Sequence, residues 1–393
     1  MRVLRSLLAS VDIILKPRSF VGPAVVSRRG NSSAATKDEN VSRVLVTGAS
    51  GYVASCIVNE LLTKGYTVRG TVRSLSNPNK VDPLKSLAER TPGTLELVEA
   101  DLLSPETWKS AVEGCSHVLH TASPFPFEQP KNAEEVVRPA VDGTLSVLRA
   151  CKEAGTVKRV VITSSVASVG VYHTTRPLTE EDWTDPSRGG PEAEPYIISK
   201  LMAEKEAFKY IESLDDKDKF EFCTVLPGFV IGPSVANQAA TSLDIVKRIM
   251  VGGDPLIPNI AFTWVDVRDV ADAHIKCMTL KQAAGQRFLI TDKSLTYRDV
   301  CKQLYDEFHD QGYSPSLRLA PRLVIRLMSL FDNAARSMNL VWGVVTTYDN
   351  SKMKNVLGIQ PRDCRQGLID MAYSLIENGY IEKSPKFKGR KTS

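Results

Sequence analysis

Six short apolar runs alternate along the chain with longer segments that have helical periodicity. The runs extend from Arg43 to Thr47, Thr67 to Val72, Leu95 to Glu99, His117 to His120, Arg159 to Thr163 and Phe222 to Leu226. The longest spacer, Glu134 to Ala154, has valine and leucine at helical intervals, which is typical of a helix packed against a core. Strands that alternate with helices predict an α/β fold, in which a doubly wound parallel sheet has helices on both faces.

A glycine-rich turn follows the first of these runs. Gly48 can form the tight turn, and Gly51 lets the backbone approach a pyrophosphate at the N-terminus of the next helix. Ala54 is small enough for that helix to pack closely on the strand. Glycines at this spacing also occur in ordinary turns, but helical periodicity and a second apolar run follow here, as in a βαβ unit. We therefore expect a dinucleotide-binding site at this turn.

The pattern becomes irregular after Gly228, where proline and glycine are frequent. Such a region predicts a smaller lobe that shapes a pocket above the carboxyl edge of the sheet. We therefore expect four parts. They are a leader at 1–40, a Rossmann-type nucleotide-binding domain at 41–227, a mainly substrate-binding lobe at 228–382 that is interleaved with the sheet, and a flexible basic tail at 383–393.

The basic charge of the chain is concentrated at its two ends. The formal net charge is +5, but residues 1–40 carry seven basic and three acidic groups, and residues 383–393 carry five basic groups. The central body is therefore acidic, which argues against a nucleic-acid surface, because such proteins concentrate lysine and arginine on the folded face. Seven cysteines without a CxxC pair are typical of buried thiols in a reducing compartment, and they predict no zinc site.

The leader contains several arginines and serines, with a single acid before Lys37. This composition is typical of a mitochondrial presequence, and the alternative is a disordered leader on a cytosolic enzyme. No apolar segment of the sequence reaches the length that a transmembrane helix needs. We expect the protein to be a monomer or a homodimer.

Two Tyr-x-x-x-Lys sequences are candidates for proton-transfer chemistry. Tyr196 and Lys200 share a face if their segment is helical, and an ammonium group near a phenol favours the phenolate. Tyr348 and Lys352 have the same spacing, and about one such pair is expected by chance. Only the first pair follows a strand that ends in Thr-Ser-Ser, where a hydroxyl would face a ligand. We therefore interpret the second pair as structural.

Together these motifs resemble the extended short-chain dehydrogenase/reductase family, in particular its branch of dihydroflavonol and cinnamoyl-CoA reductases. The likeness covers about 41–380 and includes VRS after the second strand, ADLL at 100–103, HTASP at 120–124, LPGFVIGP at 226–233 and VDVRDVADAH at 265–274. It implies an NADP-dependent oxidoreductase that transfers hydride to the carbonyl of a small aldehyde or ketone and requires no metal.

The resemblance also implies roles for individual residues. Ser165 would bind the substrate carbonyl, Tyr196 would donate its proton, and Lys200 would hold the nicotinamide ribose. Ser164 is the alternative to Ser165. The implied cofactor-binding residues are Gly48, Ser50, Gly51, Tyr52, Val53, Arg73, Lys80, Asp101, Leu102, Thr121, Ala122, Ser123, Tyr196, Lys200 and Pro227.

Arg73 bears on the choice between NAD and NADP. A carboxylate at the end of the second strand would bind the ribose 2′-hydroxyl of NAD, whereas an arginine accommodates the 2′-phosphate of NADP. Lys80 matches a family position that also meets this phosphate. We therefore expect NADPH as the cofactor.

Three alternatives share parts of this pattern. A hydroxysteroid or alcohol dehydrogenase would use the same residues in the opposite direction. NAD-dependent sugar-nucleotide epimerases and dehydratases share the fold, but dehydratases tend to carry an acid just after the serine or threonine, where this chain has Val166 and Ala167. A non-catalytic NADP-sensing module would be expected to lack Tyr196 or Lys200. The cinnamoyl-CoA branch typically has Asn-Trp-Tyr-Cys-Tyr around its tyrosine, whereas this chain has EPYIISK, which argues against CoA thioesters as substrates.

Overall fold

A seven-stranded sheet forms the centre of the molecule, and every neighbouring pair of its strands is parallel. The structure is a computed structural model that describes residues 43–123, 134–172, 174–189, 195–235, 240–331 and 333–390. In spatial order the strands are β3 (Thr94–Glu99), β2 (Thr67–Val72), β1 (Val44–Thr47), β4 (His117–His120), β5 (Arg159–Thr163), β6 (Glu221–Pro227) and β9 (Arg287–Ile290). The predicted doubly wound α/β fold is confirmed.

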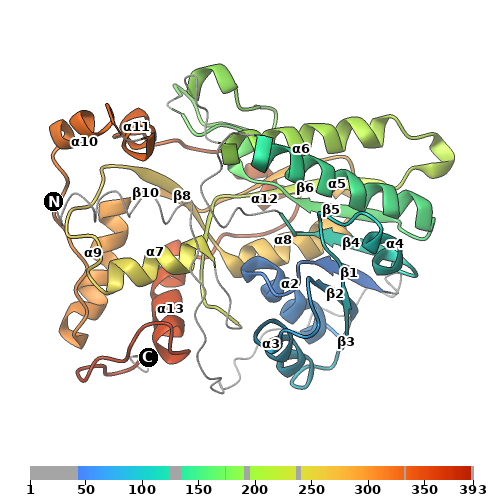
Figure 1. Cartoon of the computed structure of the whole chain (residues 1–393), viewed down its shortest axis with the longest axis horizontal. Coiled ribbons are helices and arrows are strands. Elements are labelled where there is room, and N and C mark those ends of the chain that lie inside the picture. Colours follow the sequence, from blue (N-terminus) through green and yellow to red (C-terminus); the bar gives the residue numbers. More distant parts are fainter. Residues whose placement is uncertain are drawn as a thin grey trace.

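Helices cover both faces of this sheet (Figure 1). One face packs against α4 (Thr107–Val112), α5 (Glu134–Ala154) and α6 (Pro195–Glu212). The other face packs against α2 (Tyr52–Thr63), α3 (Pro78–Ala88) and α8 (Val267–Thr279). The central strands β1 and β4 are buried at every position because both of their faces are covered.

The direction of winding reverses between β1 and β4. From β1 the chain proceeds outward through β2 to β3, and then returns to place β4, β5 and β6 on the other side of β1. At such a reversal the loops after two neighbouring strands diverge and leave a crevice at the carboxyl edge of the sheet, where ligands bind in open α/β folds. This crevice is therefore the expected position of the dinucleotide.

The part of the chain after Gly228 contributes to both layers of the molecule. It forms a second, three-stranded sheet of β10 (Lys293–Thr296), β8 (Ala261–Asp266) and β7 (Phe229–Ile231), and it also returns α8 and β9 to the main sheet. The six predicted strands are present to within one residue at each end, but β7, β8, β9 and β10 were not predicted. These four strands lie in the region where proline and glycine interrupt the alternation of apolar runs and helical spacers, so the pattern does not single them out.

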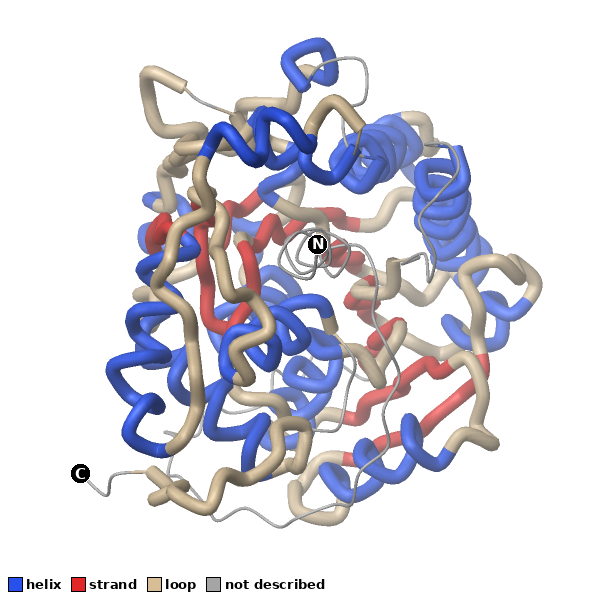
Figure 2. Tube along the Cα trace, turned by 60° about the vertical axis from the view of Figure 1, so that its left-hand side comes forward, coloured by secondary structure: helices blue, strands red, loops and turns tan. Residues whose placement is uncertain are grey.

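Further helices complete the second lobe (Figure 2). They are α7 (Thr241–Met250), α9 (Tyr297–Phe308), α10 (Arg322–Met328), α11 (Asn333–Leu340), α12 (Ser351–Asn355) and α13 (Cys364–Glu377). Short 3-10 turns lie at η1 (Val166–Ser168), η2 (Pro186–Gly189), η3 (Asp216–Asp218), η4 (Lys281–Ala283) and η5 (His309–Gln311). Within the described ranges, no helix combines the length and the apolar character that crossing a bilayer requires.

The described part of the C-terminal segment, 383–390, is docked on the second lobe, contrary to the expectation of a flexible tail. The ring of Phe387 packs edge-on against Tyr313, with centroids 6.4 Å apart, and lies 6.0 Å from the ring of Tyr373. Arg390 pairs with Asp370 of α13 at 3.2 Å. Arg390 therefore meets acids of the fold, and the Phe387 ring, which a count of charges overlooks, packs the segment against the second lobe. The expected leader at 1–40 lies outside the described residues.

All seven cysteines are buried and unpaired. Burial raises the pKa of the Cys56, Cys151 and Cys301 thiols well above the ordinary value, because an apolar surrounding disfavours the thiolate. The cysteines therefore act as small core residues, as their number and spacing predicted.

Candidate active site

The glycine-rich turn has the shape that a close backbone approach requires. Gly48 has a φ of +64°, and a Cβ at this position would lie 3.2 Å from the Cβ of Ala122. The amide of Gly51 donates to the Gly48 carbonyl at 2.8 Å, and Gly51 precedes α2 without a side-chain cap. The first amides of any helix lack a partner within the helix, and in α2 neither a capping side chain nor an acid in the first turn compensates them. The turn thus suits an anionic group such as a pyrophosphate.

Tyr52 differs from the expectation in how it can contribute. Its ring is buried, and its hydroxyl donates to the carbonyl of Gly232 at 2.6 Å. Burial raises the pKa of this phenol well above its ordinary value. The side chain therefore belongs to the contact between α2 and the second lobe, and only the backbone amide of Tyr52 is available to a cofactor. Ser50 and Val53 flank it on the same turn, each half-buried.

Two cations lie beyond the end of β2. Arg73 follows the strand directly and is exposed, and Lys80 lies in the first turn of α3. The pKa of Lys80 is lowered, first because burial removes water from the ammonium and second because the charge of Arg73 is close. Two positive groups that repel each other are stabilised by a doubly charged anion between them, which is the chemistry of a ribose 2′-phosphate.

Asp101 and Leu102 lie at the carboxyl end of β3. The Oδ1 of Asp101 accepts the Leu103 amide at 2.9 Å and shapes the turn. Leu102 packs against Gly143 of α5, where a Cβ would come within 3.0 Å of the leucine side chain. The carboxyl ends of β1, β2 and β3 thus carry the glycine turn, the cation pair and this half-buried apolar surface in a row.

Thr47 joins the ends of β1 and β4. Its Oγ1 accepts the amides of Thr121 at 3.1 Å and Ala122 at 3.0 Å, and it contacts the Nδ1 of His120 at 2.9 Å. Since two amides already donate to this oxygen, the hydroxyl proton is assigned to His120, whose Nδ1 then accepts. Burial, and next the nearby charge of Lys200, lower the pKa of His120 to about 3, so the ring is neutral. His120 was not among the predicted site residues, although it begins the HTASP motif.

Tyr196 and Lys200 lie one turn apart on α6. The Nζ of Lys200 is 5.9 Å from the centre of the Tyr196 ring and donates to the Oγ of Ser123 at 3.3 Å. Tyr196 is 39% exposed, so the residue is open to a small molecule. Residues of β4, β5 and α6 line one cleft here, and they include His120, Ser123, Thr163, Ser164, Lys200 and Glu204. Pro227 lies buried at the end of β6.

Ser165 follows β5 and begins the short turn η1. Its Oγ accepts the amide of Ala167 at 3.1 Å, so its own proton is available to another acceptor. The rival Ser164 donates to the Oε2 of Glu204 at 2.6 Å and is therefore committed to the protein interior. Among the hydrogen bonds of the described residues, none joins Ser165 to Tyr196.

Glu204 lines the cleft and is the centre of a buried polar network. It lies one turn after Lys200, and its Oε1 accepts Arg287 at 2.9 Å and Thr224 at 2.7 Å. Arg287 also donates to the Asp182 carbonyl at 2.9 Å and stacks on the Trp183 ring at 3.6 Å. The network therefore connects α6 and β9 with the segment between Ser165 and Tyr196. Sequence reasoning missed it, although a glutamate four residues after the lysine offered a signal.

Both ring nitrogens of His274 have a hydrogen-bond partner within the protein. Its Nε2 contacts the Oγ1 of Thr163 at 2.7 Å, and its Nδ1 contacts the Val270 carbonyl at 2.7 Å. Burial lowers the pKa of His274 to about 4. A carbonyl can only accept, so the neutral ring carries its proton on Nδ1 and accepts from the threonine.

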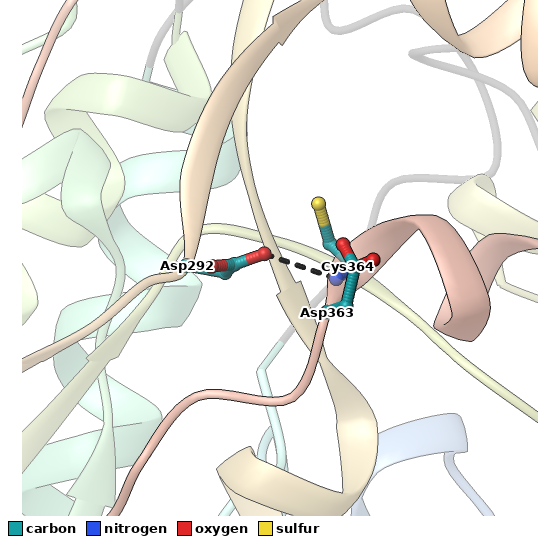
Figure 3. Close-up of side chains that lie close together, drawn as sticks. All are labelled: Asp292, Asp363 and Cys364. Atoms are coloured by element: carbon teal, nitrogen blue, oxygen red, sulfur yellow. Dashed lines mark hydrogen bonds between the residues drawn. The ribbon is translucent and has the colours of Figure 1, made fainter.

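A group of Asp292, Asp363 and Cys364 offers three possible metal ligands away from this cleft (Figure 3). Asp292 accepts the Cys364 amide at 3.0 Å, and Asp363 caps α13 through the Arg365 amide. Lys293 pairs with both carboxylates, at 3.6 Å and 2.8 Å. The carboxylates thus already have the partners that a helix start and a lysine provide.

Comparisons with known proteins agree with the geometry of this site. The sequence model of the NAD dependent epimerase/dehydratase family matches residues 44–290. Cinnamoyl-CoA reductase CAD2 of Medicago truncatula is 37% identical over 280 residues, covering 70% of this chain and 82% of that protein. Dihydroflavonol 4-reductase of Hordeum vulgare is 35% identical over 281 residues, covering 69% and 76%.

Among solved structures, the yeast methylglyoxal/isovaleraldehyde reductase Gre2 in complex with NADPH has a TM-score of 0.69. It is 28% identical and covers 85% of this chain and 98% of its own. The matched region begins at β1 and ends with β9, so it includes the glycine turn, β5 and α6. The chain therefore belongs to the NAD dependent epimerase/dehydratase family, in its branch of dihydroflavonol and cinnamoyl-CoA reductases, and it is an oxidoreductase.

Proposed function

We propose that the protein reduces the carbonyl of a small aldehyde or ketone with NADPH. The observation that carries the proposal is the placement of Tyr196 and Lys200 one turn apart on α6, where Tyr196 is exposed and Lys200 lines the cleft at the carboxyl edge of the sheet. A phenol, an ammonium and a serine hydroxyl beside a dinucleotide site are the groups that proton transfer to a reduced carbonyl requires.

Residues of this chain suit the charged groups of the cofactor. The α2 amides behind Gly48 and Gly51 suit the pyrophosphate, and Arg73 with Lys80 suits a 2′-phosphate. When bound, the nicotinamide supplies the hydride. The charge of the two cations favours NADPH over NADH, because NADH would leave them without a phosphate.

The remaining chemistry belongs to the protein. The free proton of Ser165 can donate to the carbonyl oxygen and hold it against the phenol. Tyr196 then donates its proton to that oxygen as negative charge develops on it, and the ammonium of Lys200 stabilises the resulting phenolate. Lys200 donates to Ser123 within the segment after β4, which keeps the ammonium at the crevice. The neutral state of the adjacent His120 adds no second positive charge that would repel it.

Steady-state assays on the purified full chain test the proposal. We expect oxidation of NADPH with aldehydes and ketones, and the panel includes methylglyoxal, isovaleraldehyde and a dihydroflavonol. Oxidation of neither NADPH nor NADH by any carbonyl, together with turnover of a nucleotide sugar in the presence of NAD, would instead support the epimerase alternative.

Cofactor preference has its own variant. Arg73→Glu replaces an attraction for the 2′-phosphate by a repulsion, so the preference for NADPH over NADH in kcat/KM should fall by about 10- to 100-fold, the equivalent of one charge-assisted hydrogen bond. Arg90→Glu, an exposed arginine just after α3, makes the same change of charge and should leave the preference unaltered. An unchanged preference in Arg73→Glu would remove Arg73 from the cofactor site.

A further inference from the structure

Four large apolar side chains are exposed within nine residues on and after α10. Relative exposures are 68% for Leu323, 57% for Leu327, 65% for Leu330 and 90% for Phe331. Single exposed leucines are common on protein surfaces, but a contiguous group of this kind marks a surface that binds a partner. We call these four residues the α10 patch.

The fold presents this patch outward and holds it in place. Ile325 is buried and fixes the inner side of α10, whereas Leu323 and Leu327 lie one turn apart on the outer side. The carbonyl of Ile325 accepts the Ser329 amide at 2.9 Å, which continues the turn to Leu330. In Figure 1, α10 and α11 lie at the end of the molecule opposite to β2 and β3, and Figure 2 turns this end toward the viewer.

Arginines flank the α10 patch. Arg322 and Arg326 are exposed one turn apart beside the two leucines, and Arg318 is exposed just before the helix. No described residue from 311 to 348 is acidic, and Asp332, which lies in that stretch, is outside the described residues. None of the ion pairs among the described residues involves these three arginines. The surface therefore combines exposed apolar groups with arginines that no ion pair of the described residues compensates.

We propose that the α10 patch is a membrane-docking surface that binds the face of an anionic lipid bilayer. Leucine and phenylalanine would enter the boundary between headgroups and acyl chains, and the arginines would remain at the level of the lipid phosphates. A guanidinium group can donate two parallel hydrogen bonds to the oxygens of one phosphate. Each basic group near an anionic surface also adds to the electrostatic attraction. The described helices do not span a membrane, so the contact is peripheral.

The charge distribution argues against other occupants. A second copy placed symmetrically on the patch would bring the arginines of both chains together. The segment 1–40, with seven basic and three acidic groups, would also be repelled. The central body of the protein has a net negative charge, whereas the α10 patch is flanked by arginines. This difference in charge orients the patch toward an anionic surface. The proposal is independent of the reaction at the active site.

Sedimentation of the full chain with vesicles tests this proposal. We expect binding to vesicles of equal parts phosphatidylcholine and phosphatidylserine, no binding to phosphatidylcholine alone, and weakening by salt. The double variant L327S/F331S should lose more than about tenfold in the partition coefficient, since it removes two large apolar groups. The triple variant R318Q/R322Q/R326Q should lose about fivefold for each arginine removed.

Matched controls separate the patch from the rest of the chain. The triple variant R90Q/K109Q/K217Q removes the same charge from exposed positions elsewhere, and Val251→Ser removes an exposed apolar group of another helix end. Both should bind vesicles as the unmodified chain does, and all variants should keep its thermal midpoint because the changed side chains are exposed.

Three results would overturn the proposal. The first is an absence of vesicle binding by the unmodified chain at low salt. The second is equal binding by the patch variants and the controls, which would assign the binding to the leader or another surface. The third is a dimer in size-exclusion chromatography that the patch variants, but not the controls, convert to a monomer.

Discussion

Tyr196 and Lys200 have the same spacing as Tyr348 and Lys352, but only the first pair lies on one helix. Lys200 lies 5.9 Å from the centre of the exposed Tyr196 ring, whereas Lys352 lies 5.2 Å over the ring of Phe288. Tyr348 precedes α12, and its buried hydroxyl donates to the carbonyl of Gly170. Burial raises the pKa of Tyr348 well above its ordinary value. An identical spacing therefore gives a reachable phenol in one place and a packing contact in the other, and the surrounding elements make the difference.

The largest expected effect is on turnover at the first pair. Tyr196→Phe removes the proposed proton donor and should lower kcat/KM by about 100- to 10,000-fold. Tyr348→Phe removes the same atom from the second pair and should leave turnover unchanged. Initial rates of NADPH oxidation by the best carbonyl substrate measure both. Similar losses in the two variants would show that the catalytic assignment is wrong.

The next effect concerns the support behind α6. Glu204→Ala leaves Arg287 buried without its partner and should lower the free energy of unfolding by about 3–5 kcal/mol. Glu206→Ala on the same helix removes only a surface pair with Lys209 and should cost about 0–1 kcal/mol. Urea denaturation gives both values. Equal losses would mean that the network does not anchor the helix of the first pair.

The pH dependence of stability sharpens the comparison further, because a neutral histidine adjoins Lys200. The pKa of His120 is about 3 in the folded chain and about 6.5 when unfolded, so the unfolded chain takes up the proton first. The stabilisation that the fold gains from a neutral His120 is fully present above pH 6.5 and is lost as pH falls toward about 3. His274, with a pKa of about 4, acts in the same direction, whereas Asp244, with a pKa raised to about 6, opposes them.

The variant His120→Asn isolates this term, because its amide oxygen can still accept from Thr47. The free energy of unfolding should fall by a few kcal/mol less between pH 6.5 and pH 4 in this variant than in the unmodified chain, on the order of the shift in pKa. His309→Asn, at an exposed position, is the control. Parallel pH curves for all three proteins would contradict the assignment of a buried neutral His120.

The smallest expected effect is on stability at the second pair. Tyr348→Phe leaves the buried Gly170 carbonyl without its donor and should lower the free energy of unfolding by about 1 kcal/mol. Tyr196→Phe changes an exposed phenol and should leave the thermal midpoint unaltered. Tyr196→Phe should therefore lose activity and keep its stability, whereas Tyr348→Phe should lose stability and keep its activity. If both variants lost the same property, the distinction between the two pairs would be wrong.

The sequence predicted the parts of the fold in which local pattern and tertiary structure agree. The strands and the long helix α5 follow from periodicity, because each buries a continuous apolar face. The strand β9 could not be found in this way. Its place beside β6 depends on a return of the chain from the second lobe, which no local pattern encodes.

In the candidate site, too, some features follow from the sequence and others depend on tertiary structure. The glycine turn, Arg73 and the pair on α6 follow from spacing and from the resemblance to a family. The neutral state of His120 does not, since it depends on burial and on a lysine 80 residues away along the chain. The commitment of Ser164 to Glu204 likewise requires that β5 and α6 already be packed together.

The burial of all seven cysteines has a practical consequence for following the protein in solution. Thiolates are the form that reacts with maleimides and disulfides, and burial both suppresses this form and blocks access to it. The intact fold should therefore be almost inert to thiol reagents, and the rate of labelling should measure how often the chain opens. The same inertness means that a single cysteine introduced on the surface would carry a fluorophore at one defined position.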